Sequence, residues 1–132
     1  MIHRINDFFF NHFLAVQVRL VNGSSYREGR VEVFYNGEWG TVCDDDFDIQ
    51  DANVICRMLG FPGASAALTD ARFGAGNANQ TIVLDDLWCL GNETSLVSCI
   101  NRRWGSSNCL HDEDAGVEIG RASCRERVYV LV

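Results

Sequence analysis

The sequence predicts a single α+β domain with long, ordered loops, and three observations support this prediction. Segments near the N-terminal end combine β-branched and aromatic residues with the alternation typical of strands. Between residues 48 and 60 the apolar residues instead recur with the period of a helix. Six cysteines are spread over the chain and can staple long loops. The 132 residues, 47% of them hydrophobic, suffice for one core, and no internal repeat is present.

The first half of the chain predicts a β-hairpin. The segments VRLV, at residues 18–21, and VEVFY, at residues 31–35, are typical of strands. Asn36-Gly37 follows the second of them and leads through Glu38 into WGTVC. An Asn-Gly pair between two such segments is a strong hairpin signal, because both residues accept a positive φ.

The segment DIQDANVICRMLG, at residues 48–60, predicts the main helix. Asp48 can cap its start and Asp51 lies in its first turn, where a carboxylate complements the helix dipole. Gly60 and Pro62 end it. One face of this helix carries apolar residues that we expect to be buried, namely Ile49, Ala52, Ile55, Cys56 and Leu59.

The second half predicts mostly loops. After the helix we expect a loop of small residues that includes GAGNANQ, at residues 74–80. A strand-like TIVLDDLWC and a short helical turn in NETSLVSC follow, and then an irregular loop over residues 101–114. Loops of this length need staples, which the cysteines can provide.

Composition and charge exclude two classes of function. The net charge of −7 argues against nucleic acid as the main partner, because phosphate binding needs a basic surface. No run of eighteen apolar residues is present, so this chain predicts no membrane-spanning helix. All eleven basic residues are arginine, whose planar fork pairs with carboxylate, phosphate or sulfate. Local arginine patches that bind a polyanion therefore remain possible, although most arginines are expected to balance nearby carboxylates.

Cysteines and glycosylation sequons together favour an extracellular protein. The cysteine spacings are long and irregular, with no CxxC pair, which favours disulfides over zinc. Three sequons begin at Asn22, Asn79 and Asn92. Residues 1–17, with a basic start and an apolar FFFNHFLAV segment, suggest a signal peptide. Because Asn11 and His12 interrupt that segment, a linker or a truncated transcript is an equal alternative.

Several motifs in one order resemble the scavenger receptor cysteine-rich (SRCR) domain over residues 18–117. They are GRVEVFYNGEWGTVCDDDFD, DANVICRMLGF, ARFGAG, IVLDDLWCLGNETSLVSC and HDEDAGV. The resemblance implies a curved antiparallel sheet that cradles the helix, in secreted or cell-surface proteins that bind proteins, polyanions or microbial surfaces. Composition and spacing alone would not indicate this binding role.

The resemblance also implies the disulfides. Cys43 should pair with Cys109 and Cys89 with Cys99, whereas Ile119 stands where a partner for Cys56 is expected. Tyr26 and Phe61 stand where the eight-cysteine version of the family has an extra pair, so the chain resembles the six-cysteine type, and we hypothesise that these two rings fill the place of that bridge.

The C-terminal stretch EIGRASCRERV does not resemble the family. It is similar to the translation of a sequencing-library adapter. We therefore expect residues 118–132 to be a non-native tail, with Cys56 and Cys124 unpaired or mispaired.

The acidic cluster after Cys43 predicts a cation site. A Cys43–Cys109 bridge would bring HDED, at residues 111–114, close to Asp44 and Asp45, and converging carboxylates suit calcium, with magnesium not excluded. The resemblance implies the same set, Asp44, Asp45 and Glu113. The alternative is that Asp44 or Asp45 pairs with Arg72 or Arg103, or caps local backbone. Further acids, Asp46, Asp48 and Asp51, are expected to be solvent-facing, cap and helix-start residues.

A second cation site is implied by the resemblance at Asp85, Asp86 and Asn108. Arg102 and Arg103, beside Trp104, are candidates to bind an anionic ligand next to the cations. Such a ligand would be held without covalent chemistry, with water or its own oxygen atoms completing the coordination shell.

An enzyme is the competing class, and the sequence argues against it. Paired carboxylates can hydrolyse glycosides, and His3, His12 and His111 invite a search for a catalytic triad. The first two lie in the N-terminal stretch, and His111 lies among carboxylates without a GxSxG-type serine. Two further alternatives remain: a non-catalytic module of a larger extracellular protease or oxidase, and an adhesion module that binds protein without calcium.

Overall fold

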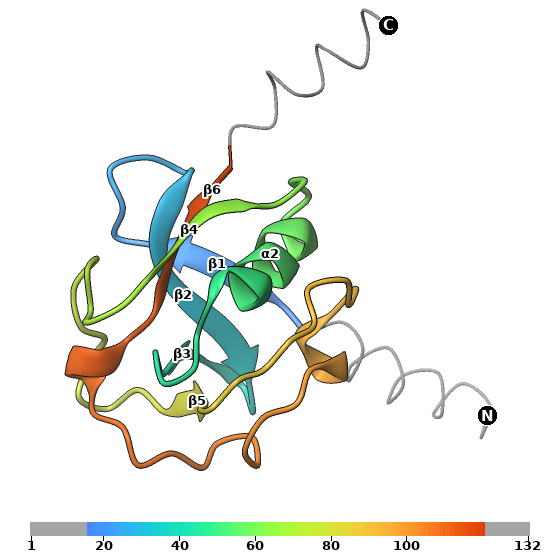
Figure 1. The fold of residues 1–132 in the computed structure, drawn as a ribbon. Coiled ribbons are helices and arrows are strands. Elements are labelled where there is room, and N and C mark those ends of the chain that lie inside the picture. The colour runs from blue at the N-terminus through green and yellow to red at the C-terminus, as the bar shows by residue number, and fades with distance from the viewer. Residues whose placement is uncertain (1–15, 121–132) are drawn as a thin grey trace, which may run out of the picture.

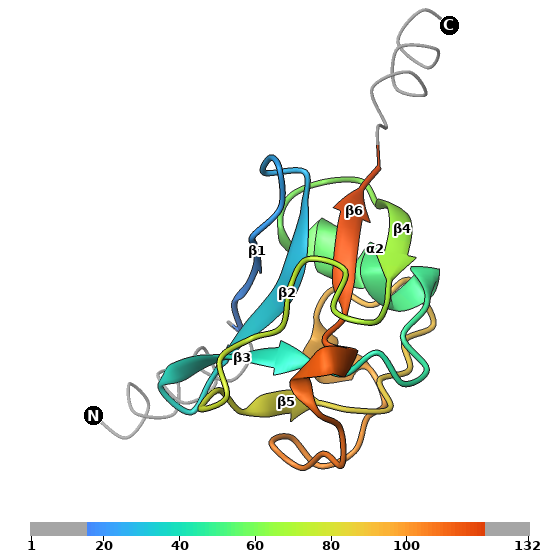
Figure 2. The ribbon, with the colours of Figure 1, turned by 90° about the vertical axis from the view of Figure 1, so that its left-hand side faces the viewer.

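The computed structural model describes residues 16–120, which form a six-stranded curled sheet with one main helix (Figures 1 and 2). This architecture confirms the predicted α+β class. The strands run in the order β4-β6-β2-β3-β5, and β1 pairs with β2. The β3–β5 pair is parallel and the other pairs are antiparallel. The strands are β1 (Val18–Val21), β2 (Glu28–Tyr35), β3 (Glu38–Val42), β4 (Ala64–Leu68), β5 (Ile82–Leu84) and β6 (Gly116–Ile119).

The predicted hairpin is formed by β2 and β3. Its turn places Asn36 at φ 57° and Gly37 at φ 88°, so both central residues adopt the left-handed conformation that the Asn-Gly pair tolerates. Strand β2 begins at Glu28, three residues before the predicted segment, because its first residues pair with β6. Val31 and Val33 are fully buried in the core.

Helix α2 (Ile49–Met58) begins as the sequence predicts. The side chain of Asp48 accepts hydrogen bonds from the backbone N–H groups of Gln50 and Asp51, and the Asp51 side chain accepts one from the N–H of Asp48, which completes a capping box. Gly60, at φ 94°, follows the last turn. The expected buried face needs one correction, because Ile49 is 39% exposed. It is the first helical residue and lies at the edge of the core, whereas Asp51 is buried.

The segments after α2 differ from the prediction in two places. The expected loop of small residues contains β4, which pairs with β6 and packs beside α2. Ala and Ser have low strand propensity, so tertiary pairing decides this element. The expected strand at TIVLDDLWC ends at Leu84, because Asp86 adopts a positive φ of 55° and turns the chain. Two short 3₁₀ helices follow, η1 (Leu96–Ser98) and η2 (His111–Glu113).

One core joins the helix to the sheet, and disulfides join the loops to it. The structure contains the Cys43–Cys109 and Cys89–Cys99 bridges, the two pairings that the resemblance implies. Within residues 16–120, Cys56 has no disulfide partner. It lies fully buried in the same apolar cluster as Ile119, where packing replaces a bridge.

The structure also bears on the C-terminal boundary of the domain and on the hypothesised contact between Tyr26 and Phe61. Strand β6 continues to Ile119, two residues beyond Val117, and Glu118 pairs with Glu28. The rings of Tyr26 and Phe61 stack with their centroids 6.1 Å apart. None of the helices in residues 16–120 has the length and apolar character of a membrane span. The expected leader and Cys124 lie outside the described residues.

Candidate functional site

Two loops bring the predicted cation ligands together at the end of β3. Cys43 forms an isolated β-bridge with Asp114. One residue further, the N–H of Asp44 donates a hydrogen bond to the carbonyl oxygen of Glu113 over 2.8 Å. The Cys43–Cys109 disulfide ties the same two loops. Residues almost 70 positions apart in sequence are thereby placed side by side by backbone contacts that do not depend on any ion.

Asp44, Asp45 and Glu113 can each direct a carboxylate oxygen to one point. Together with Cys43, their candidate ligand atoms lie within 4.8 Å of one another. Cys43 is in a disulfide, so its sulfur is no thiolate and the usable ligands are the three carboxylates. All three acids are half-buried. This is the set that the sequence analysis assigned to the first site.

Some oxygens of this set have backbone partners. Oδ2 of Asp44 accepts a hydrogen bond from the N–H of Asp70 (2.8 Å), and Oε1 of Glu113 accepts one from the N–H of Leu110 (3.2 Å). Asp44 therefore does cap local backbone, as one of the alternatives holds. Within the described chain, no arginine forms an ion pair with Asp44, Asp45 or Glu113. Pairing with Arg72 or Arg103 is thus not what the structure contains.

The repulsion between these converging carboxylates is seen in the pKa of Asp45. Its pKa is raised above the ordinary aspartate value, first by partial burial and then by the negative charges of Glu113, Asp85, Asp44 and Asp86. A raised carboxylate pKa means that negative charge here is not fully compensated. A bound cation would remove that cost.

Asp85 of the second predicted site lies directly against the first. It follows β5, is fully buried, and can share a point with Asp45 within 4.8 Å. Its Oδ2 accepts hydrogen bonds from Oγ of Ser107 (3.0 Å) and from the N–H of Asn108 (3.3 Å). Its Oδ1 is buried without a partner. A buried carboxylate oxygen without a donor is costly and rare, so the residues fit a cation at this position.

The other two members of the second set are placed differently. Asp86 accepts an ion-paired hydrogen bond from Nε of Arg102 over 2.7 Å. Asn108 is exposed and contributes its backbone N–H to Asp85, as described above. The second set is therefore brought together in part: Asp85 and Asp86 adjoin, but Asp86 already has an arginine partner.

The candidate ligand-binding arginines lie in the irregular loop that follows η1. Arg102 and Arg103 are exposed. Trp104, the next residue, is partly buried against the core, with its ring centroid 5.5 Å from that of Tyr35. Arg102 is committed to Asp86, whereas Arg103 forms no salt bridge with another described residue.

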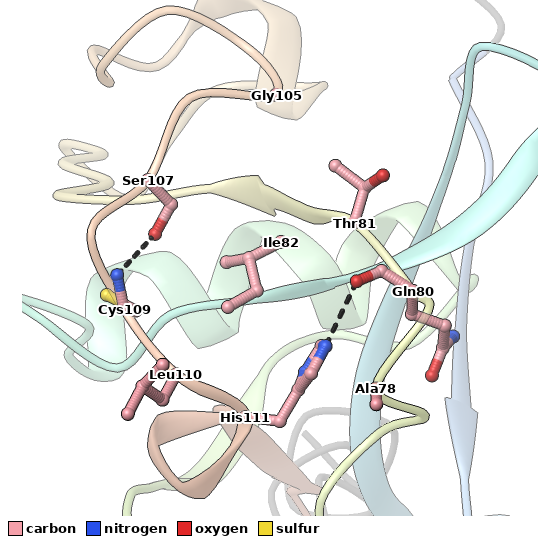
Figure 3. A pocket seen from close by; sticks show the side chains of 9 residues that line it. All are labelled: Ala78, Gln80, Thr81, Ile82, Gly105, Ser107, Cys109, Leu110 and His111. Carbon is pink, nitrogen blue, oxygen red and sulfur yellow. Dashed lines mark hydrogen bonds between the residues drawn. The ribbon is translucent and has the colours of Figure 1, made fainter.

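His111 lines a cavity of about 280 Å³ beside the acidic loops (Figure 3). Its Nδ1 lies 2.9 Å from Oδ2 of the buried Asp114, and its Nε2 lies 3.0 Å from the carbonyl oxygen of Gln80. Both ring nitrogens are engaged with structural partners. Ser107 also lines the cavity and accepts a hydrogen bond from the N–H of Cys109 (Figure 3), and its hydroxyl donates to Asp85. These hydrogen bonds hold the loop in place, and they do not pair Ser107 as a nucleophile with His111 as its base. His3 and His12 lie outside the described residues.

Sequence reasoning missed one surface next to this site. Trp88 and Ile100 form a β-bridge and are 55% and 63% exposed, and Leu90, two residues from Trp88, is 71% exposed. Between them Cys89 is buried, so the Cys89–Cys99 bridge lies under an apolar surface. Alternation in DDLWCL signals it, because Leu87 and Cys89 point inward and Trp88 and Leu90 outward.

The three sequon asparagines are all exposed. Asn22 has φ 67°, and its Nδ2 donates a hydrogen bond to the carbonyl oxygen of Phe73. Glycosylation at Asn22 would have to replace that bond. Asn79 and Asn92 have no such restraint among the hydrogen bonds of residues 16–120, and all three remain predictions.

The family model of the scavenger receptor cysteine-rich domain matches residues 21–119. A scavenger receptor cysteine-rich domain superfamily protein from Patiria pectinifera is 54% identical over 100 residues, which are 76% of this chain and 9% of that protein. Galectin-3-binding protein from Rattus norvegicus is 52% identical over 100 residues, 76% of this chain and 17% of that protein.

Solved structures agree with the fold. The third SRCR domain of murine neurotrypsin has a TM-score of 0.72 and 48% identity, covering 79% of this chain and 95% of that domain. The dimeric form of the SRCR domain of mouse MARCO has a TM-score of 0.65 and 48% identity, covering 78% and 94%.

The chain therefore belongs to the scavenger receptor cysteine-rich family, whose domains are recognition modules of extracellular proteins and receptor ectodomains. It spans less than a fifth of the length of the curated relatives quoted above.

Proposed function

We propose that this domain is a non-catalytic extracellular recognition module that binds anionic ligands, including polyanions and microbial surfaces, through calcium at Asp44, Asp45 and Glu113. One observation carries the proposal. Three carboxylates from two loops converge within 4.8 Å, and no arginine in the described residues neutralises them. Calcium takes six to eight oxygen ligands, so a site with three carboxylates leaves positions for water and for a ligand oxygen.

The donor set supports a hard cation. All candidate ligand atoms are oxygen, and the neighbouring sulfurs are in a disulfide. The raised pKa of Asp45 and the unpartnered Oδ1 of Asp85 indicate unbalanced negative charge on both sides of the cluster. Magnesium shares the preference for oxygen but demands stricter octahedral geometry, so a comparison of the two ions belongs to the test.

In this proposal Asp44, Asp45 and Glu113 would hold the cation, and the exposed loop that carries Arg102 and Arg103 would contact the ligand. The guanidinium of Arg103 has no ion-pair partner among residues 16–120 and can take a sulfate or carboxylate through two parallel hydrogen bonds. A single exposed contact of this kind is weak. Useful affinity would then come from several copies acting together, in a parent protein or on a surface.

The test is calorimetric titration of calcium into the chain and into an Asp45→Asn/Glu113→Gln double variant. Asp112→Asn is the matched control, because Asp112 is an exposed acid in the same short helix η2. We expect saturable binding that the double variant loses and the control keeps. Absence of both heat and thermal stabilisation by calcium, in protein with native near-UV circular dichroism, would overturn the proposal.

A second candidate function, calcium-independent binding of a protein partner, is favoured by the exposed surface of Trp88, Leu90 and Ile100. Trp and Arg are enriched at the centres of protein interfaces, and Arg102 lies at the end of this surface next to Asp86. A protein partner that binds in the presence of chelator, and that is lost with Trp88→Ser but kept with Asp45→Asn, would establish this function.

Both candidates are compatible with a larger parent protein. An adjoining catalytic domain in the parent transcript would make this chain the recognition module of an extracellular protease or oxidase. Collagen-like repeats or tandem copies would support a scavenger-type receptor, in which valency supplies affinity.

A further inference from the structure

Arg102 stands out among the charged groups around the cluster. Asp45 shares one convergent group with Asp85 and another with Asp44 and Glu113, and the negative charge of Asp86 also acts on Asp45. Among residues 16–120, Arg102 is the one side chain that forms an ion pair with any of them. It is therefore the built-in counter-charge of the cluster.

The contact is well placed but loosely held. Nε of Arg102 lies 2.7 Å from Oδ2 of Asp86, and the two side chains are 48% and 36% exposed. The backbone N–H of Arg102 donates to the carbonyl oxygen of Asp85 over 3.1 Å, which fixes the start of the side chain. An exposed ion pair contributes little free energy, so the guanidinium can leave Asp86 while the backbone stays in place.

The neighbouring carboxylate lacks the donor that Asp86 has. Asp85 is fully buried, and its Oδ1 has no hydrogen-bond partner. Arg102 thus neutralises the exposed member of the pair and leaves the buried member uncompensated. A divalent ion beside Asp85 would satisfy that oxygen and would also attract Asp86, which has to exchange its partner to reach it.

We infer that Arg102 is a tethered competitor of the cation: it leaves Asp86 when a divalent ion binds beside Asp85, and its freed guanidinium then binds the anionic ligand. The inference rests on the proposed function, of which it names the regulation. Before cation binding, Nε of Arg102 is held by Asp86, and the charge of that carboxylate weakens the attraction of the guanidinium for an anionic ligand. Afterwards the same loop presents two free arginines, Arg102 and Arg103.

This exchange couples the two binding events. If the cation frees Arg102 for an anion, then an anion that holds Arg102 must raise the affinity for the cation by the same factor. The factor is limited by the strength of the ion pair that is exchanged. For an exposed pair it corresponds to about a two- to fivefold change in affinity.

The first experiment is a calcium titration of the chain and of Arg102→Gln and Arg103→Gln. The two variants remove the same charge from adjacent exposed positions, and Arg103 forms no salt bridge with a described residue. The general loss of positive charge is therefore matched. We expect Arg102→Gln to bind calcium about two- to fivefold more tightly than Arg103→Gln, because only it loses the competitor.

The second experiment measures binding to immobilised dextran sulfate with and without calcium. In the unchanged chain and in Arg103→Gln, calcium should strengthen binding through Arg102. In Arg102→Gln that increment should fall by the same two- to fivefold factor. Asp86→Asn, which releases Arg102 without any ion, should raise binding in the presence of chelator.

The outcomes separate the two claims. If neither the unchanged chain nor Arg102→Gln binds calcium while both are folded, the proposed function fails. If all bind calcium but Arg102→Gln and Arg103→Gln behave alike in both experiments, the cation site stands and the competitor role of Arg102 is wrong.

Discussion

Two buried carboxylates in this domain have opposite surroundings. Glu32, in β2, accepts hydrogen bonds from Arg19 (2.7 Å) and Gln80 (2.9 Å) and lies 3.4 Å from Arg30. Burial alone would raise the pKa of Glu32, but these partners outweigh it and lower the pKa. Asp85, after β5, has a hydroxyl and one N–H for its Oδ2 and nothing for its Oδ1.

The difference is between a buried charge that the fold neutralises and one that it leaves available for a cation. Glu32 lies within the sheet, where the fixed register supplies its arginines: Arg19 is its directly paired residue in β1, and Arg30 precedes it by two residues in β2 itself. Asp85 lies where the sheet ends and loops meet, and its neighbours are further acids. The sheet neutralises its own buried acid, whereas the loop cluster relies on Arg102 or on a cation from solution.

The largest effect should come from removing the partners of Glu32. In an Arg19→Gln/Arg30→Gln variant the buried carboxylate is left with Gln80 alone, which should cost on the order of 3 to 5 kcal/mol in the free energy of unfolding. Urea denaturation measures this cost. Adding Glu32→Gln should recover part of it, and a failure to recover would mean that the arginines act through packing instead.

A disulfide between Cys56 and position 119 should raise the free energy of unfolding of the whole domain, in which both acids are measured. Cys56 and Ile119 lie in the same buried cluster, so Ile119→Cys should form the bridge that the family resemblance implies and add about 2 to 4 kcal/mol. Thermal unfolding with and without reductant measures the gain. In Cys56→Ser/Ile119→Cys it should vanish, and equal melting of both variants would argue that the two positions cannot join.

A third buried carboxylate, Asp51, has no arginine partner among the described residues, and the pH dependence of stability shows the consequence. Asp51 is fully buried and accepts N–H bonds from Asp48 and Cys89 but pairs with no arginine in the described part of the chain, and burial raises its pKa to about 7. Because its folded pKa lies above its unfolded value, the folded state binds the extra proton.

The protonated Asp51 side chain therefore contributes fully to the free energy of unfolding at low pH, and this contribution is lost as pH rises through the folded pKa. The loss between about pH 5 and pH 7 should be at most about 2 kcal/mol. Asp51→Asn should flatten this stretch of the urea-denaturation profile. Glu32, with its lowered pKa, contributes in the opposite sense: its stability is present above its unfolded pKa and is lost as pH falls. An unchanged profile in Asp51→Asn would assign the slope to other groups.

Asp85→Asn should stabilise the calcium-free domain, whereas removing the arginine partners of Glu32 destabilises it. An amide keeps one oxygen acceptor for Ser107 and Asn108 and removes a negative charge that lies among other acids, so without calcium the variant should be about 1 kcal/mol more stable. With calcium the order should reverse, because the unchanged chain gains binding energy that the variant lacks. Destabilisation of Asp85→Asn in the presence of chelator would contradict the comparison.

The smallest effect should come from giving the loop cluster an arginine of its own. Leu110 is 70% exposed, and its N–H already donates to Glu113. Leu110→Arg should stabilise the calcium-free domain by less than about 1 kcal/mol and weaken calcium binding. Leu110→Gln controls for the lost apolar surface. Unweakened calcium binding in Leu110→Arg would mean that the cluster is not short of positive charge.

Local features of the sequence were sufficient for most of the secondary structure. The Asn36-Gly37 turn, the Asp48 cap and the strand at residues 18–21 are where the sequence predicts them, because each depends on conformational preferences of a few adjacent residues. The prediction failed for β4, a run of Ala and Ser that becomes a strand only through its partner β6. It also failed for Ile49, whose exposure depends on where the core ends.

The sequence by itself determined which chemical groups this domain possesses: an excess of carboxylates, arginine as its only strong base, and cysteines for bridges. Beyond the sets that the family resemblance implied, only the tertiary structure decided which of these groups meet. Asp45 and Asp85 are 40 positions apart in the sequence. Their shared charge, the unpartnered Oδ1 of Asp85 and the pairing of Arg102 with Asp86 arise because β3, β5 and the two following loops end at one place. Such convergence depends on long-range strand pairing and disulfides, which no local pattern encodes.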